Sequence, residues 1–192
     1  MNMKSLKGSL LIASPGLMDP NFLRTVVLVA EHTKEGALGL VLNRPTETRV
    51  ADLWSTLGGE PRQTDLVAFV GGPVQKNSLL LLHGHGDLAQ DAEPVVPGVF
   101  LSSEIEVFGK LLEREGDLSG SPHGLLKVFC GYSGWGPGQL DREMKEGGWL
   151  TAPASSDHVF RDSPERLWMK AIGALGGVYE FFSMMPPNPE MN

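Results

Sequence analysis

The sequence predicts a single α+β domain whose sheet is curled and either mixed or mostly antiparallel. Apolar, β-branched segments of strand length follow one another in hairpin-like runs, with short amphipathic helices interspersed among them. Strict alternation of strand and helix, which would indicate a doubly wound parallel sheet, is absent. The length of 192 residues is that of one domain, so residues 1–192 are treated as one unit.

The first half of the chain is dominated by strand-like segments. Residues 25–31 and 36–43 are apolar and rich in β-branched side chains, and the polar residues between them end in glycine, a pattern typical of a β-hairpin. Apolar residues recur at helical spacing over 50–57 and are followed by Gly58, so a short helix is expected there. Further strands are expected at residues 8–13, 66–70 and 78–83.

The second half combines short strands with helices. One helix is expected after Gly138, and another begins at Pro164, behind an N-cap at Ser163, and ends at Gly176. A helix over about 104–113 is expected to turn four apolar residues inward, namely Ile105, Phe108, Leu111 and Leu112. Strands are expected at residues 99–101, 125–130, 149–152 and 158–161.

Charge and cysteine content limit the classes of function. The net charge is −7, with 16 basic and 23 acidic residues and no basic run, which disfavours direct DNA binding. Cys130 is the only cysteine, so no intramolecular disulfide forms. No apolar stretch reaches the ~7–15 residues of a signal-peptide core or the ~18–20 residues of a membrane span. We therefore expect a cytoplasmic protein without a membrane segment.

Three segments carry a resemblance to a known family. They are GSLLIASPGLMDPNFLRTVVLVAEH with GALGLVLNRP (residues 8–45), VGGPVQKNSLLLLH (70–83) and FCGYSGWGPGQLDREMKEGGWL (129–150), and the tail PPNPEMN (186–192) is similar as well. With these segments the chain resembles the AlgH/YqgE family over nearly its whole length. The resemblance implies a single complex α/β domain in which a bifurcated mixed sheet curls into a pseudo-barrel with flanking short helices. The AlgH name is linked to transcriptional regulation of alginate production, which implies an indirect effect on transcription.

A candidate binding site is predicted from polar and glycine-rich positions within these segments. Arg44 offers a rigid fork suited to a carboxylate or phosphate, and the glycine turn after residue 70 can present backbone N–H groups to an anion. Gln139 and Glu143 are four residues apart and so share a helix face. That face borders the same concavity or, equally well, is a solvated helix face. The candidate ligand-binding residues are Asn43, Arg44, Gly71, Gly72, Tyr132, Trp135 and Gln139.

The alternative for the same residues is a structural network, which we favour. In that interpretation Asp19 or Glu31 pairs with Arg24 or Arg44, and Asn43 closes a turn. Substitution of Arg44 by alanine separates the two, since a purely structural arginine lowers thermal stability without loss of binding.

No catalytic or metal motif is complete. The segment Gly131–Trp135 resembles the nucleophile elbow G-x-S-x-G, but Trp135 replaces the last glycine, so we expect no catalytic serine. We expect instead a glycine-permitted turn that lets Tyr132 and Trp135 pack. His83, His85 and Asp87 lack a further ligand at a definite spacing, so no metal is expected. Cys130 has no evident basic neighbour to stabilise a thiolate and is expected to be structural.

The sequence therefore favours a non-catalytic regulatory or interaction module without a cofactor, acting through a protein partner. One alternative is a protein that binds a small anionic or nucleotide-like ligand at Arg44 and the glycine turns. Another is an enzyme of an unrecognised class. The sequence leaves the oligomeric state open.

Overall fold

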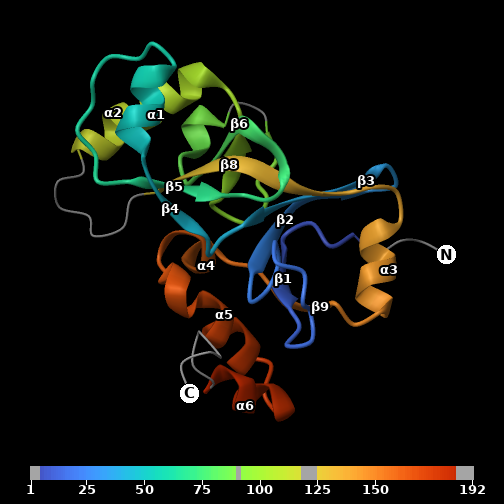
Figure 1. The fold of residues 1–192 in the computed structure, drawn as a ribbon. Coiled ribbons are helices and arrows are strands. Elements are labelled where there is room, and N and C mark those ends of the chain that lie inside the picture. Colours follow the sequence, from blue (N-terminus) through green and yellow to red (C-terminus); the bar gives the residue numbers. More distant parts are fainter. Residues whose placement is uncertain (1–4, 90–91, 118–124, 185–192) are drawn as a thin grey trace.

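A computed structural model describes residues 5–89, 92–117 and 125–184 (Figure 1). Nine strands of this described part form one sheet. The strands are β1 (Ser9–Ala13), β2 (Val26–Thr33), β3 (Gly36–Val41), β4 (Pro45–Arg49), β5 (Val67–Val70), β6 (Val74–His83), β7 (Phe100–Ser102), β8 (Leu126–Trp135) and β9 (Trp149–Pro153). The helices are α1 (Val50–Thr56), a 3-10 turn (Gly86–Leu88), α2 (Ile105–Asp117), α3 (Gln139–Lys145), α4 (Ser156–Phe160), α5 (Pro164–Gly173) and α6 (Val178–Ser183).

The sheet branches at β8, which confirms the mixed, bifurcated arrangement. The first half of β8 pairs in parallel with β5 and antiparallel with β6, whereas its last residues pair with β3, with Gly39 opposite Ser133. The main path runs β4-β5-β8-β3-β2-β1-β9, and β7 extends the branch through β6. The path remains open, with β4 and β9 at its ends, so the pseudo-barrel implied by the resemblance is not closed.

The central strands are apolar on both faces because helices cover both faces (Figure 1). Alternate residues of β1, such as Leu10 and Ile12, face a cluster that includes Leu167 of α5. Leu11, between them, faces the opposite cluster, which includes Leu140 of α3. A third cluster lies beneath α1 and α2 on the β6–β8 branch. The two-sided cover explains why β1 and β2 read as continuous hydrophobic runs.

The largest correction concerns Gly131–Trp135, which the sequence predicted as a turn and which is the end of β8. Gly131 has a φ of 70°, and a Cβ there would lie 2.8 Å from the Val74 carbonyl oxygen and 2.9 Å from that of Gly72. The glycine therefore allows strands to approach closely without ending the strand. Because β8 continues to Trp135, Val74 pairs with Tyr132, and β6 starts at Val74, four residues before its predicted start at Ser78.

The other corrections fall at short elements. Residues 158–161, predicted as a strand, belong mostly to α4, which a capping box between Ser155 and His158 begins. The strand β4 and the helix α6 were not predicted. On α2, Ile105 is 43% exposed and Val107 is buried in its place. The proline-containing tail, residues 186–192, lies outside the described residues.

Candidate functional site

Asn43 has a structural role, as the network interpretation predicts. Its Oδ1 accepts from the Val26 backbone N–H at 2.9 Å, and its Nδ2 donates to the Arg24 carbonyl at 2.9 Å. The side chain therefore ties the end of β3 to the start of β2. Each end of its amide therefore has a backbone partner.

Both backbone polar groups of Gly71 form hydrogen bonds with neighbouring strands. Its N–H donates to the Cys130 carbonyl at 3.0 Å, and its own carbonyl accepts from the Val41 N–H at 2.9 Å. A Cβ on Gly71 would lie 2.2 Å from the Gly131 oxygen, and one on Gly72 would lie 2.3 Å from the Ser133 nitrogen. Both glycines are needed because the connection between β5 and β6 passes directly against β8.

Arg44 lies in a hollow of about 300 Å³, which we call the Arg44 hollow. Its Nη2 donates to the Leu23 carbonyl at 2.6 Å, which holds the guanidinium in place. Among the described residues neither Arg44 nor Lys76 forms an ion pair, so the predicted pairing of Arg44 with Asp19 or Glu31 is not observed. The lining consists of Pro20, Asn21, Val41, Arg44, Pro45, Val70, Gly72, Pro73 and Lys76.

A larger cleft of about 680 Å³ lies over α3, and we call it the Glu143 cleft. The Glu143 carboxylate accepts three hydrogen bonds of 2.9 Å. Its Oε2 receives the indole N–H groups of Trp135 and Trp149, and its Oε1 receives the Gln139 amide. Gln139 in turn accepts from the Gly136 N–H at 3.1 Å. Gln139 and Glu143 thus line one concavity, but it is the Glu143 cleft and not the hollow that holds Arg44.

Aromatic rings form one wall of the Glu143 cleft. Phe22 stacks on Trp135 with 6.2 Å between ring centroids, and it meets Trp149 edge-on at 5.3 Å. Both indoles are nearly buried, at 5% and 3% exposure, so their faces belong to the core. The charged residues of the lining are all acidic, namely Asp19, Glu143 and Glu146.

The seven predicted site residues do not surround one concavity. Arg44 and Gly72 line the Arg44 hollow, whereas Trp135 and Gln139 line the Glu143 cleft. Tyr132 lines a third depression, beside Trp135, and Asn43 and Gly71 line none of the three. The Arg44 hollow and the Glu143 cleft nevertheless adjoin, since Asn21 and Pro73 belong to the lining of both.

Sequence reasoning missed several lining residues. Lys76 and Asn21 stand in segments that were already quoted for the family resemblance, but neither belongs to a motif with known chemistry. Trp149 was assigned only to a strand. Its partnership with Glu143 depends on the return of β9 to the edge of β1, a long-range pairing that no local pattern encodes.

Ser133 and Cys130 lack the environment of a nucleophile. Ser133 is fully buried within β8, and its hydroxyl donates to the Gly71 carbonyl at 3.1 Å. Burial raises the pKa of the Cys130 thiol above its ordinary value, which disfavours the reactive thiolate. Both residues are therefore structural members of the branching strand.

A histidine that binds a metal donates its other ring N–H to an acceptor, and the hydrogen bonding at His83 and His85 differs from this. The His83 Nδ1 accepts from the His85 backbone N–H at 3.3 Å, so the proton of the neutral ring is on Nε2, the atom that a metal would need. Burial lowers the pKa of both rings and favours this neutral form. Asp87 pairs with Arg114, and no group of three candidate ligands occurs within residues 5–89, 92–117 and 125–184.

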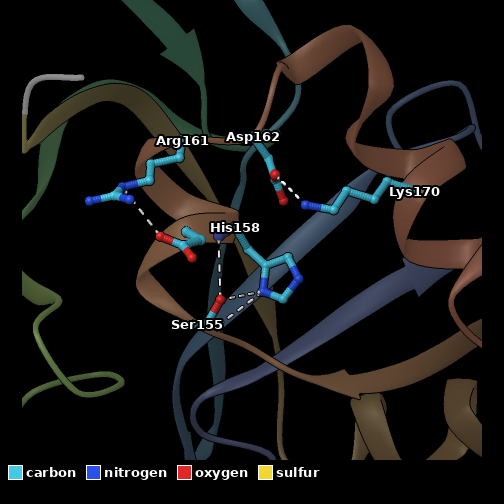
Figure 2. A network of polar contacts seen from close by, with 6 residues as sticks. Ser155, His158, Arg161, Asp162 and Lys170 are labelled. Carbon is cyan, nitrogen blue, oxygen red and sulfur yellow. Dashed lines mark hydrogen bonds and ion pairs between the residues drawn. The ribbon is translucent and has the colours of Figure 1, made fainter. Parts of the chain in front are cut away.

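A polar network at α4 and α5 (Figure 2) contributes no residue to the lining of either hollow. Figure 2 shows the capping pair of Ser155 and His158, and the ion pair between Asp162 and Lys170, whose atoms are 2.5 Å apart. Beyond this network, Lys127 of β8 donates to the Leu42 carbonyl at 3.2 Å, and its ammonium lies 4.4 Å from the centroid of the Phe69 ring. Burial lowers the pKa of Lys127 to about 8, although Asp162 and Glu165 act in the opposite direction.

The chain is similar to proteins whose names state no activity. A model of the AlgH-like family (DUF179) matches residues 10–180. A UPF0301 protein of Chlorobaculum tepidum is 40% identical over 185 residues, covering 96% of this chain and 95% of that protein. A UPF0301 protein of Chlamydia felis is 37% identical over 188 residues, covering 97% and 95%.

Two solved structures share the fold. The solution structure of the AlgH protein from Pseudomonas aeruginosa matches with a TM-score of 0.70 and 30% identity, covering 97% of this chain and 98% of that one. A crystal structure of a protein from Corynebacterium diphtheriae matches with a TM-score of 0.72 and 20% identity, covering 96% and 95%. Within the described residues, every helix is too short or too polar to cross a membrane.

Proposed function

Since the chain belongs to the AlgH-like family, whose names carry no activity, we propose a function from the site itself: a non-catalytic module that binds a small anionic ligand in the Arg44 hollow. One observation carries the proposal. Arg44 and Lys76 converge on a concave surface whose lining contains no carboxylate, and neither cation is neutralised by an ion pair with a described residue.

The surroundings of Arg44 support binding of a carboxylate or phosphate. The Leu23 carbonyl fixes one nitrogen of the guanidinium, so less side-chain freedom is lost when a ligand binds. Prolines at positions 20, 45 and 73 stiffen the walls, and Val70, which is 40% exposed, gives the hollow an apolar floor. A ligand with an anionic group and a small apolar body fits this combination.

Binding can be tested by isothermal titration calorimetry with inorganic phosphate, citrate and nucleotides at low ionic strength. We expect one of these anions to bind with a 1:1 stoichiometry, and Arg44→Gln and Lys76→Ala each to weaken binding by about tenfold, the loss of a charge-assisted hydrogen bond of ~1.5 kcal/mol. Lys34→Ala, which removes an exposed cation outside the hollow, is the matched control. Equal affinity in all four proteins would refute the assignment.

A second candidate function is that of an interaction module, which acts on transcription indirectly through a protein partner in the cytoplasm. The observation that favours it is at α6, where Val178, Phe181 and the C-cap residue Met184 are 65–74% exposed at a spacing of three residues. Exposed apolar residues grouped on one helix are typical of contact surfaces. The test is affinity purification with wild type and with Phe181→Ser. A partner retained equally by both proteins would exclude α6 as the contact.

A further inference from the structure

We propose that the Glu143 cleft holds the cationic end of the same ligand, so that the complete ligand is dipolar and of the size of a short peptide. The inference rests on the proposed function, because it assigns the ligand's anionic end to the Arg44 hollow. It adds a second subsite and the class of molecule that spans both.

The two hollows adjoin. Asn21 and Pro73 line both of them, so a ligand bound in one lies directly beside the other. Their volumes of about 680 Å³ and 300 Å³ exceed what a single phosphate or ammonium ion fills. Ligand pockets of this size accept molecules with several functional groups.

The two adjoining hollows differ in the sign of their charged residues. The lining of the Arg44 hollow contains cations and no carboxylate, whereas that of the Glu143 cleft contains carboxylates and no lysine or arginine. In a protein with a net charge of −7, an acidic cleft alone indicates little. Its position directly beside the basic hollow is the independent observation, since two adjoining subsites of opposite sign are complementary to a molecule with both charges.

The acidic end is also pre-organised. Three N–H donors fix the Glu143 carboxylate, and Asp19 Oδ1 accepts from the backbone N–H and the side-chain amide of Asn21, at 2.8 Å and 3.1 Å. Asn21 thus connects the acidic end to the boundary between the two subsites. Fixed carboxylates lose little freedom when a ligand's ammonium or guanidinium approaches. A lysine or arginine side chain of a peptide supplies such a cation, and the peptide's terminal carboxylate supplies the anion.

Three synthetic peptides test the two subsites separately. The first is N-acetylated Lys-Gly-Gly with a free carboxylate, the second is its C-terminal amide, and the third has norleucine in place of lysine. Binding is measured at low ionic strength by NMR chemical-shift perturbation. We expect the norleucine peptide to bind about three- to fivefold more weakly than the lysine peptide, because it lacks one exposed ion pair. The affinity of the amide should fall by at least as much.

Protein variants identify the acidic partner. Glu146→Gln and Asp19→Asn are exposed substitutions that leave the buried contacts of Glu143 intact, and Glu106→Gln on α2 is the control. We expect the first two variants to bind the lysine peptide about threefold more weakly than wild type and to bind the norleucine peptide with unchanged affinity.

The outcomes separate this inference from the proposed function. If the norleucine peptide binds as tightly as the lysine peptide while the amide binds more weakly, the Arg44 hollow takes an anion but the dipolar ligand is wrong. If no peptide binds while inorganic phosphate does, the inference is overturned in the same way. If neither phosphate nor any peptide binds, both proposals fall.

Discussion

The pH dependence of stability provides a sensitive test of how Lys127 is buried. We compare the wild type with Lys127→Met, a change that keeps the aliphatic length but removes the ammonium. In the folded protein the pKa of Lys127 is lowered from 10.5 to about 8, with burial as the largest cause. Between these two values the unfolded chain binds more protons than the folded one, so the free energy of unfolding rises with pH in the wild type.

The size of this rise follows from the two pKa values. Below pH 8 both states are protonated, and the folded state bears the whole destabilisation. Above pH 10.5 both are neutral and the destabilisation is gone. The full difference corresponds to about 3 kcal/mol, of which about 2.5 kcal/mol is gained between roughly pH 7 and pH 10. Lys127→Met has no group to titrate, so its stability relative to wild type falls by that amount over the same range.

The assay is urea unfolding followed by tryptophan fluorescence at both pH values. Taking the difference between variant and wild type cancels the titration of other groups, including Cys130. Lys110→Met, at an exposed position of α2, is the control and should show the same pH profile as wild type. A difference between Lys127→Met and wild type that stays constant from pH 7 to pH 10 would refute a buried, partly neutralised Lys127.

Three further predictions concern the site and its surroundings. Glu143→Ala should lower the free energy of unfolding by about 2–4 kcal/mol, because the buried indole N–H groups of Trp135 and Trp149 lose their acceptor. Thermal denaturation measures this change, and a loss of less than about 1 kcal/mol would contradict the prediction. Gly71→Ala should cost at least about 2 kcal/mol, because its Cβ would overlap the Gly131 carbonyl; a neutral result in chemical denaturation would contradict the close approach. Gel-shift titration at ~150 mM salt should detect no tight, specific DNA complex, because the net charge is −7, and such a complex would overturn the charge argument.

Local signals in the sequence were sufficient for most of the core. The apolar runs at β1, β2 and β3 and Pro164 at the first position of α5 predicted elements that the structure confirms, although α5 ends at Gly173 and not at the predicted Gly176. They succeeded because strand length, β-branched side chains and helix caps act over a few residues. The predictions failed where local and long-range effects conflict. At Gly131–Trp135 the glycines indicate a turn locally, but pairing with β3 keeps the segment extended.

The candidate site was predicted only in part for the same reason. Gln139 and Glu143 lie on one helix, so their common orientation followed from spacing alone. The separation of Arg44 from Trp135 depends on how β3, β5 and β8 converge, and no spacing in the sequence reveals that. The tertiary fold brings together the segments that do meet, around Asn21 and Pro73.

The position of the branching strand late in the chain has a consequence for biosynthesis. While the ribosome is still translating the first 125 residues, β3 and β5 have been made but the strand that joins them has not. Their edges then offer unpaired N–H and C=O groups beside apolar surface, a combination that recruits chaperones or neighbouring nascent chains. Premature termination before β8 therefore produces a fragment prone to aggregate, whereas termination after β9 leaves every strand of the sheet with its partners.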